Sequence, residues 1–310
     1  LGVGFTRVDL DERTMREWVS SSLSSLDQPS GDGINLALVS RAAREAGWVV
    51  ALAGTGADEL HGAYGHAARL DRLKHLLQAG GPLAFQVLRR WGDWRWGRGS
   101  RDVERWGLLL SAAPDSERML QEKRRYFTPG EIRDLWPESE VWIQKEDSAL
   151  VDLWTFQQNG WREQIRLAEI CGYLRNTLLR DADAVTMAQG QELRVPFLGK
   201  SYVEHVLRAP IRITSGRGSQ KPELFRLLSQ QGRRELSGAK RGFTLDYRSW
   251  LLGAFRDDFH EAGRTLEKKL GFRLSTKTLL EDLERQPGQK RARRLWSLLA
   301  LGRHLGHSNE

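Results

Sequence analysis

The chain has 310 residues, of which 40% are hydrophobic and 28% charged, a composition typical of a folded globular protein rather than a disordered one. No apolar run reaches the ~18 residues that a membrane-spanning helix needs, and a single cysteine, Cys171, excludes an internal disulfide. The formal net charge of +8 would attract polyanions, but no zinc-finger or RNA-binding motif accompanies it. These features predict a cytoplasmic protein with no membrane partner, for which nucleic acid is not the expected ligand.

The first elements of the chain alternate between predicted strand and helix. Residues 3–8 are strand-like, and helices are expected over 11–26 and 35–46. Between the helices, residues 27–33 (DQPSGDG) are rich in turn-forming types. This segment is predicted to be either a plain turn or a loop whose polar side chains face a ligand.

The segment WVVALAGTGADELHGAY, residues 48–64, is the first that indicates chemistry. Residues 48–53 have the length and apolar character of a buried strand, and a Gly-Thr-Gly turn (54–56) and an acidic pair (58–59) follow. In open α/β sheets ligands bind at the carboxyl ends of strands, where glycines let backbone N–H groups approach a phosphate or carboxylate. Asp58 could then hold the metal ion that accompanies nucleotide phosphates. The alternative is a strand, a loop and a helix start whose acidic residues complement the helix dipole.

A stretch rich in Trp and Arg, residues 89–101, interrupts a helical pattern that begins near residue 67. Its arginines alternate with Trp91, Trp94 and Trp96, which could stack on bases or lie at a membrane surface. The favoured interpretation is an ordinary loop whose tryptophans pack beneath neighbouring helices.

The longest helical region is expected over 151–191, and it ends in a cluster of charges. Asp181 and Asp183 lie on this helix, whereas the segment 192–196 (ELRVP) leaves it because a residue before proline disfavours helical geometry. For Asp181 and Arg194 the preferred interpretation is a buried ion-pair cluster that fixes the helix exit. Cys171 is expected to be a small core residue rather than a catalytic one.

The C-terminal part is expected to be helical apart from one basic loop. Residues 237–243 (SGAKRGF) carry Lys240, which could swing into a site on a mobile loop, although a plain surface lysine is the alternative. A short helix is expected over 246–252, and amphipathic helices with a solvated basic face are expected over 253–310.

Three separated segments together resemble the synthetase domain of glutamine-dependent asparagine synthetases. They are DQPSGDGIN, VALAGTGADELHGAY, and LLRDADAVTMAQGQELRVPFL followed by AKRGFTLDYRSWL. The resemblance implies an α/β fold of the adenine-nucleotide α-hydrolase-like (Rossmann-like) type, with a parallel sheet that is here partial. On this basis residues 1–66 are expected to be the partial nucleotide-binding sheet region, and residues 67–310 the mainly helical remainder of one continuous domain.

The resemblance also implies a reaction. ATP and Mg²⁺ would activate the side-chain carboxylate of aspartate as a β-aspartyl-adenylate, with release of pyrophosphate, and ammonia from glutamine would then displace AMP. The implied partners are aspartate or another carboxylate, ammonia, and a glutaminase domain upstream or in trans; a homodimer is a further expectation.

Four positions are implied to bind the nucleotide. Ala53 and Gly54 occupy the AMP-contacting Ser-Gly of the family, and Gly56 belongs to the same turn. Asp58 stands where a carboxylate binds the metal and the pyrophosphate.

Three further positions are implied to act in catalysis. Thr55 occupies a position that is Glu in many members and is important for making the adenylate. Lys240 stands where a lysine stabilises charge that builds on the α-phosphorus. Glu192 lies in the family's E-x-R-x-P element, which shapes the substrate pocket.

The departures from the family pattern are also informative. The pyrophosphate loop S-G-G-x-D-S and the glutaminase domain with its N-terminal cysteine are not found in residues 1–310, so an upstream portion is expected and these residues alone are expected to be inactive. Thr55 in place of Glu and Gly199 in place of Asp keep open a related amidotransferase or cyclase that adenylates another carboxylate. The missing pyrophosphate loop keeps open a degenerate module that binds a nucleotide or partner. His61 in place of Phe is interpreted as a packing substitution.

Overall fold

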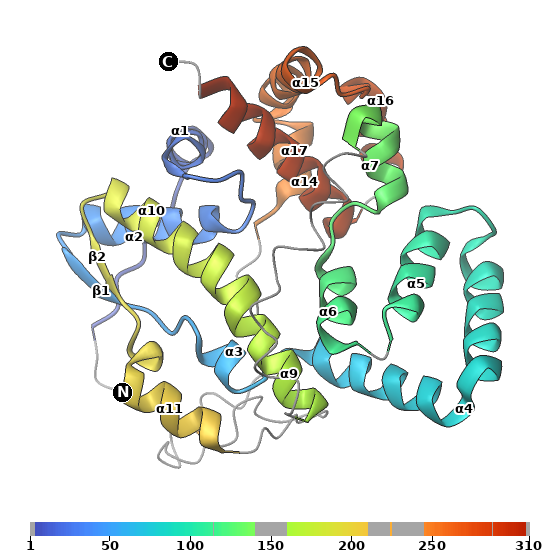
Figure 1. Cartoon of the computed structure of the whole chain (residues 1–310). Coiled ribbons are helices and arrows are strands. Elements are labelled where there is room, and N and C mark those ends of the chain that lie inside the picture. The colour runs from blue at the N-terminus through green and yellow to red at the C-terminus, as the bar shows by residue number, and fades with distance from the viewer. Residues whose placement is uncertain are drawn as a thin grey trace.

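The computed structural model describes residues 4–113, 115–139, 160–209, 224, 245–286 and 288–307. Within these residues the protein is mainly helical, with a small parallel sheet at one side of the molecule (Figure 1). The expected α/β fold is thus confirmed in its parallel pairing and in its helical remainder, and the Rossmann-like assignment stays a prediction. None of the described helices is both long and apolar enough to cross a membrane.

Two helices precede the sheet, as the sequence predicts. Helix α1 (Glu12–Ser25) begins at Asp11, whose carboxylate accepts the N–H of Thr14 at 2.7 Å, and α2 spans Gly33–Glu45. The strand expected over 3–8 is wrong for its described part, residues 4–8, which pair with no described strand. Phe5 is 88% exposed there, so the described residues do not cover this stretch.

The sheet consists of two short parallel strands. Strand β1 (Val50–Leu52) pairs with β2 (Glu192–Arg194) in the register Val50 to Glu192 and Leu52 to Arg194. The ladder continues beyond β1, because the N–H of Ala53 donates to the carbonyl of Arg194 at 2.9 Å. The turn after β1 is therefore held beside the residues that follow β2.

The strand at 48–53 forms, but the prediction that it is buried is wrong. Trp48, Val49 and Leu52 are 58%, 53% and 74% exposed. Two strands of three residues leave most of their side-chain surface uncovered by the described residues.

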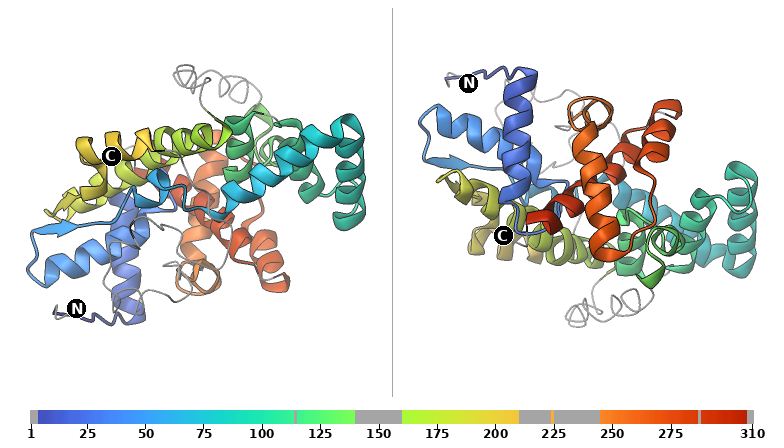
Figure 2. Two further views of the ribbon diagram at one scale, coloured as in Figure 1. Left: turned by 90° about the horizontal axis from the view of Figure 1, so that it is seen from below. Right: turned by 90° about the horizontal axis from the view of Figure 1, so that it is seen from above.

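A bent helix leads away from the sheet. After the short α3 (Ala57–Leu60), helix α4 (Gly65–Trp96) breaks at Gly81, which has φ 50° and ψ −142° and precedes Pro82. The second half of α4 pairs with α5 (Arg101–Ser111), and this hairpin projects from the body in all three views (Figures 1 and 2). We call residues 82–111 the arm.

The tryptophan-rich stretch is only partly packed as predicted. Residues 89–96 are helical rather than a loop. Trp91 and Trp96 lie 5.8 and 5.9 Å from the ring of Trp106, so these rings pack together, whereas Trp94 is 80% exposed. The prediction that the tryptophans pack beneath neighbouring helices is therefore wrong for Trp94 and holds only in part for Trp91, which is 45% exposed.

The middle of the chain folds around a second, smaller core. Helices α6 (Ser116–Arg124) and α9 (Trp161–Ala168) pack against α4 and α5 through buried residues such as Met119 and Ile165. Helix α7 (Pro129–Leu135) begins with a capping box formed by Thr128 and Glu131, and a single 3-10 turn, η1 (Pro137–Ser139), follows it. A cavity of about 540 Å³ with a mainly apolar lining opens beside the bend of α4, where it is lined by residues of α4 and α5 and by Ala113.

One long helical run brings the chain back to the sheet. It passes from α9 through an 11-residue π-helical segment, η4 (Glu169–Leu179), into α10 (Arg180–Ala188). The expected long helix is confirmed over its described part. The π-helical geometry, which is uncommon beyond one turn and frequent at functional sites, was not expected from the sequence.

The C-terminal helices build the main core. After η5 (Pro196–Leu198) and α11 (Lys200–Arg208), the described elements are α14 (Tyr247–Leu252), α15 (Arg256–Leu270), α16 (Thr276–Arg285) and α17 (Gln289–His307). The helices expected over 246–252 and beyond are confirmed. The basic loop 237–243, with Lys240, lies outside the described residues.

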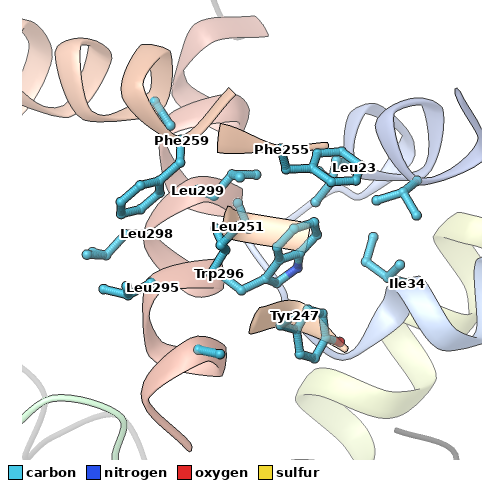
Figure 3. Packing of buried hydrophobic residues seen from close by; sticks show 14 of the residues in the cluster. Leu23, Ile34, Tyr247, Leu251, Phe255, Phe259, Leu295, Trp296, Leu298 and Leu299 are labelled. Carbon is cyan, nitrogen blue, oxygen red and sulfur yellow. The ribbon is translucent and has the colours of Figure 1, made fainter. Parts of the chain in front are cut away.

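Trp296 lies at the centre of this core (Figure 3). Its side chain is 1% exposed, and its ring lies 5.1 Å from that of Tyr247 and 5.3 Å from that of Phe255. Leu23 of α1 and Ile34 of α2 belong to the same cluster. The core thus joins helices from both ends of the chain.

Candidate functional site

The glycine turn after β1 is the centre of the candidate site. Its backbone is fixed by the sheet on one side and by α3 on the other, where the N–H of Leu60 donates to the carbonyl of Gly56 at 2.9 Å. The turn therefore follows the carboxyl end of a parallel strand, as the sequence predicts.

Gly56 is required by both conformation and space. Its φ is 90°, in the left-handed region that side chains with a Cβ rarely adopt. A Cβ at this position would lie 2.4 Å from Cδ2 of Leu198, in the turn after β2. The two loops that follow the strands are thus packed directly against each other.

Backbone donors are available at the turn. Among the described residues, the N–H groups of Gly54, Thr55 and Gly56 donate to no carbonyl or side chain. Gly54 is exposed, Thr55 and Asp58 are half-buried and Gly56 is buried, so the turn is most accessible at Gly54. Such N–H groups can donate hydrogen bonds to phosphate or carboxylate oxygens.

A buried carboxylate lies directly behind the turn. Glu59 is 2% exposed and accepts a hydrogen bond from the hydroxyl of Tyr64. Burial raises the pKa of Glu59 above its ordinary value, although the Tyr64 hydroxyl opposes this. Burial and the neighbouring carboxylate in turn raise the pKa of Tyr64, so the phenol keeps its proton.

A second buried carboxylate, Glu169, connects the turn region with the π-helical segment. Its Oε1 lies 2.7 Å from Nε2 of His66, and its Oε2 pairs with the guanidinium of Arg124. The ring of His66 stacks on that of Tyr64, with centroids 5.3 Å apart. Glu169 therefore holds α4, α6 and η4 together behind the turn.

Arg124 extends this network toward the loop 27–32. Its guanidinium lies 3.7 Å from the ring centroid of Tyr173 in η4. The Tyr173 hydroxyl donates to Oδ2 of Asp32 at 3.1 Å. Burial and Asp32 raise the pKa of Tyr173, which keeps this donor protonated.

The loop 27–32 is fastened to α10 by Asp181. The amide of Gln28 donates to Asp181 Oδ1 at 2.8 Å, and the Ser30 hydroxyl donates to Oδ2. Burial raises the pKa of Asp181, partly offset by these two donors. The loop is therefore an organised part of the site region rather than a plain turn, and its Asp32 faces Tyr173.

The buried ion-pair cluster expected at the helix exit is wrong. Asp181 is buried, but its partners are an amide and a hydroxyl rather than a cation. Arg194 does pair with Glu192, at 2.7 Å, yet these side chains are 62% and 57% exposed. Both project from the same uncovered strand, where water is available to the charges.

The seven predicted site residues are brought together only in part. Residues 53–58 share one turn, which contains Ala53, Gly54, Thr55, Gly56 and Asp58. Glu192 pairs with Val50, two strand residues before the end of β1, so the register brings Arg194 nearer to the turn than Glu192. Lys240 lies outside the described residues.

Two other residues with a predicted role have ordinary surroundings. Cys171 is half-buried on η4, and burial raises the pKa of its thiol, which opposes a nucleophilic role. His61 contacts the hydroxyl of Tyr202 through Nε2 at 2.8 Å, in agreement with a packing substitution.

The network behind the turn was missed by sequence reasoning. Glu59 and Tyr64 belong to the segment 48–64, which indicates a site without singling them out. Glu169 is a lone acidic residue in an apolar helix, which is also a weak signal. Arg124 gave none, because a single arginine at the end of a polar helix is common.

The described residues suit a magnesium ion that is bound partly through substrate phosphates, rather than a metal site built from protein side chains alone. No group of three His, Cys, Asp or Glu side chains suited to a metal occurs among them. Asp58 offers one carboxylate beside the three free backbone donors. Mg²⁺ typically binds through one or two carboxylates, substrate phosphates and waters, so this donor set is compatible with it.

Comparisons with known proteins identify the family of the chain. The family model described as asparagine synthase matches residues 1–306. Proteins of Mycobacterium bovis and of two strains of Mycobacterium tuberculosis, provisionally named asparagine synthetase (glutamine-hydrolyzing), are 30% identical over 233 residues. The chain belongs to the asparagine synthase family.

The matched region covers 73% of this chain but 34% of each of these relatives. The chain thus spans about a third of the length of the curated relatives it matches. No solved structure matches the chain closely enough to be compared.

Proposed function

We propose that this chain is the carboxylate-activating part of an ATP-dependent amide-forming ligase, and that aspartate is its substrate. The observation that carries the proposal is the turn 53–58, which follows a parallel strand in a chain of this family and offers three backbone donors beside Asp58. The expected products are asparagine, AMP and pyrophosphate, with ammonia drawn from glutamine.

Four residues of the turn have a proposed task. The N–H groups of residues 54–56 would donate to phosphate oxygens, and the Asp58 carboxylate would hold Mg²⁺ with the pyrophosphate. ATP and Mg²⁺, when bound, supply the electrophilic phosphorus and neutralise the leaving pyrophosphate. Lys240 is proposed to offset negative charge at the reacting phosphate.

The network behind the turn would keep these groups in position. Glu59 is held by Tyr64, and Glu169 is held by His66 and Arg124, so neither acid is free to move toward the ligand. Residues locked in this way support precise placement of a neighbouring reactive site.

Thr55 favours a second candidate, in which another carboxylate is activated by the same chemistry. Many members of the family have Glu at this position, and a carboxylate there could attract a cationic group of the substrate. The Thr55 hydroxyl carries no charge and cannot do this. A related amidotransferase or a cyclase would meet this condition.

The test is carboxylate-dependent exchange of labelled pyrophosphate into ATP by the native-length protein. Aspartate should support exchange, and Asp58→Asn should reduce it by about a hundredfold, the effect expected when a metal contact is lost. Asp9→Asn is the matched control, because Asp9 lies in an exposed pair with Arg7. Exchange with another carboxylate alone would favour the second candidate, and no exchange with any carboxylate would indicate a module that only binds.

A further inference from the structure

The arm carries an exposed apolar stripe that the proposed function does not use. Leu83, Val87, Trp91 and Trp94 are 71%, 58%, 45% and 80% exposed. They follow one another at spacings of four, four and three residues, which places them on one face of the helix. We call these four residues the arm stripe.

The opposite face of the same helix is already packed. Phe85 and Leu88 pack against the second core, and Gly92 touches the indole of Trp106, where a Cβ would lie 2.3 Å from Cδ1. A surface helix normally has one apolar face, directed toward the core. This helix has a second apolar face, which the described residues leave open apart from the ring contacts of Trp91 with Trp96 and Trp106.

Positive charge borders the arm stripe. Arg89, Arg90 and Arg95 are exposed, and no acidic side chain among the described residues forms an ion pair with any of them. Arg98 approaches Asp93 only at 4.0 Å. The stripe is therefore flanked by cations that have no partner in the described part of the protein.

The position of the arm makes this surface accessible. The arm projects from the body on one side in both views of Figure 2, and the second half of α4 forms one of its two helices. An exposed helix of this kind can lie flat on a plane without a collision between that plane and the body of the protein.

We propose that the arm binds the surface of an anionic lipid membrane. The arm stripe would enter the interface between headgroups and acyl chains, and the flanking arginines would contact the lipid phosphates. Tryptophan and arginine suit this position, since each combines an apolar body with a polar end. The proposal replaces the sequence-based expectation of no membrane partner with a peripheral contact.

Charge decides against a second copy of the chain as the occupant. Two arm stripes packed face to face would bring their arginines together, and like charges in an interface oppose association. Lipid headgroups of negative charge complement the same arginines, and the net charge of +8 adds a longer-range attraction.

The experiment is co-sedimentation with phosphatidylcholine vesicles that either contain or lack phosphatidylserine. Binding is expected on the anionic vesicles and should weaken as salt screens the charges. Trp94→Ala should lower the partition coefficient about tenfold, from the loss of a large buried side chain. Trp48→Ala is the matched control, because Trp48 is 58% exposed outside the arm, and it should bind like the wild type.

The charged residues have their own pair of variants. Arg89→Gln with Arg90→Gln should lower binding to anionic vesicles about thirtyfold, as expected for two basic residues near such a surface. Arg13→Gln with Arg264→Gln, two exposed arginines outside the arm, should weaken binding much less, through the lower net charge alone. Circular dichroism of each variant checks that the helices remain.

Several results would overturn the proposal. These are no sedimentation with either vesicle, equal effects of the arm and control variants, or a dimer in light scattering that Trp94→Ala abolishes. Tight binding to single-stranded RNA without vesicle binding would also contradict it. None of these results bears on pyrophosphate exchange, so the two proposals fail separately.

Discussion

The Trp296 core and the β1–β2 strand pair use similar residues in opposite ways. Trp296 is 1% exposed and contacts side chains from several helices, whereas Trp48, beside β1, is 58% exposed. The core collects helices from both ends of the chain, while the sheet has only six residues in its two strands. An apolar residue is buried only where other elements arrive to cover it.

This difference has a functional side. The core needs nothing beyond the described residues to exclude water, so its helices can serve as a rigid support. The strand pair and its turn are exposed on the side where the proposed ligand would bind. The two regions are connected by polar contacts through Glu169, Asp32 and Asp181.

The largest difference in unfolding free energy is expected between alanine variants of the two tryptophans. Trp296→Ala should lower the free energy of unfolding by about 3–5 kcal/mol, because it leaves a large cavity in a closed core. Trp48→Ala should change it by less than about 0.5 kcal/mol, as is usual for exposed positions. Urea denaturation followed by circular dichroism measures both, and similar losses would break the comparison.

Glu169 tests the contacts that connect the turn region to the helices. Glu169→Gln should lower the free energy of unfolding by about 2–3 kcal/mol, since Arg124 would lose the carboxylate that compensates its partly buried charge. Glu267→Gln, an exposed change on α15, is the control. If the two variants have the same urea midpoint of unfolding, Glu169 does not stabilise the contact between the turn region and the helices.

Two glycines of the same turn sharpen the comparison further. Gly56→Ala should cost about 2 kcal/mol, from its left-handed φ and from contact with Leu198. Gly54→Ala should be close to neutral in unfolding, because a Cβ there meets nothing within 4 Å. A neutral Gly56→Ala would mean that the loops after β1 and β2 can separate at little cost.

Two carboxyl groups should respond to pH with opposite sign. At Glu131 burial opposes ionisation, but the Thr128 N–H, Arg294 and Arg105 together lower its pKa below 4.5. Its ionised form therefore stabilises the fold above pH 4.5, and this contribution is lost as the pH falls through the lowered value. Burial raises the pKa of Asp181 above 3.8, so its ionisation weakens the fold as the pH rises from 3.8 through the raised value.

For each corresponding variant, the difference in unfolding free energy from the wild type should change by about 1 kcal/mol across the pH range. Glu131→Gln should lose most stability at neutral pH and less below pH 4.5. For Asp181→Asn, the free energy of unfolding should instead rise relative to that of the wild type as the pH rises above 3.8. Urea unfolding between pH 3 and pH 7, within roughly the range where carboxyl groups titrate, measures both slopes. Slopes of the same sign would contradict the assigned environments.

Local signals in the sequence predicted the helices well. The helix expected from residue 11 begins where Asp11 caps it, because a capping side chain acts on backbone N–H groups of its own segment. Strand burial could not be predicted in this way, because it depends on which other segments cover the strand. The same reason explains the wrong strand over 3–8.

The site was predictable only where one short segment contains it. The turn 53–58 follows from glycines and acids that are adjacent in sequence. The contacts of Glu169 with His66 and Arg124 join residues separated by 103 and 45 positions, and no local pattern records such pairs. The exposure of Trp94 likewise depends on where α5 packs against α4 within the arm.

The most direct test of the account measures aspartate-dependent pyrophosphate exchange by the native-length protein and by residues 1–310 side by side. We predict pyrophosphate exchange by the native-length protein and exchange near background for residues 1–310 alone. The reason is that the turn 53–58 would supply only part of a phosphate-binding site. Equal exchange by both would contradict the expectation that an upstream portion is needed. No exchange by either, with aspartate or with any other carboxylate, would contradict the assignment of carboxylate activation itself.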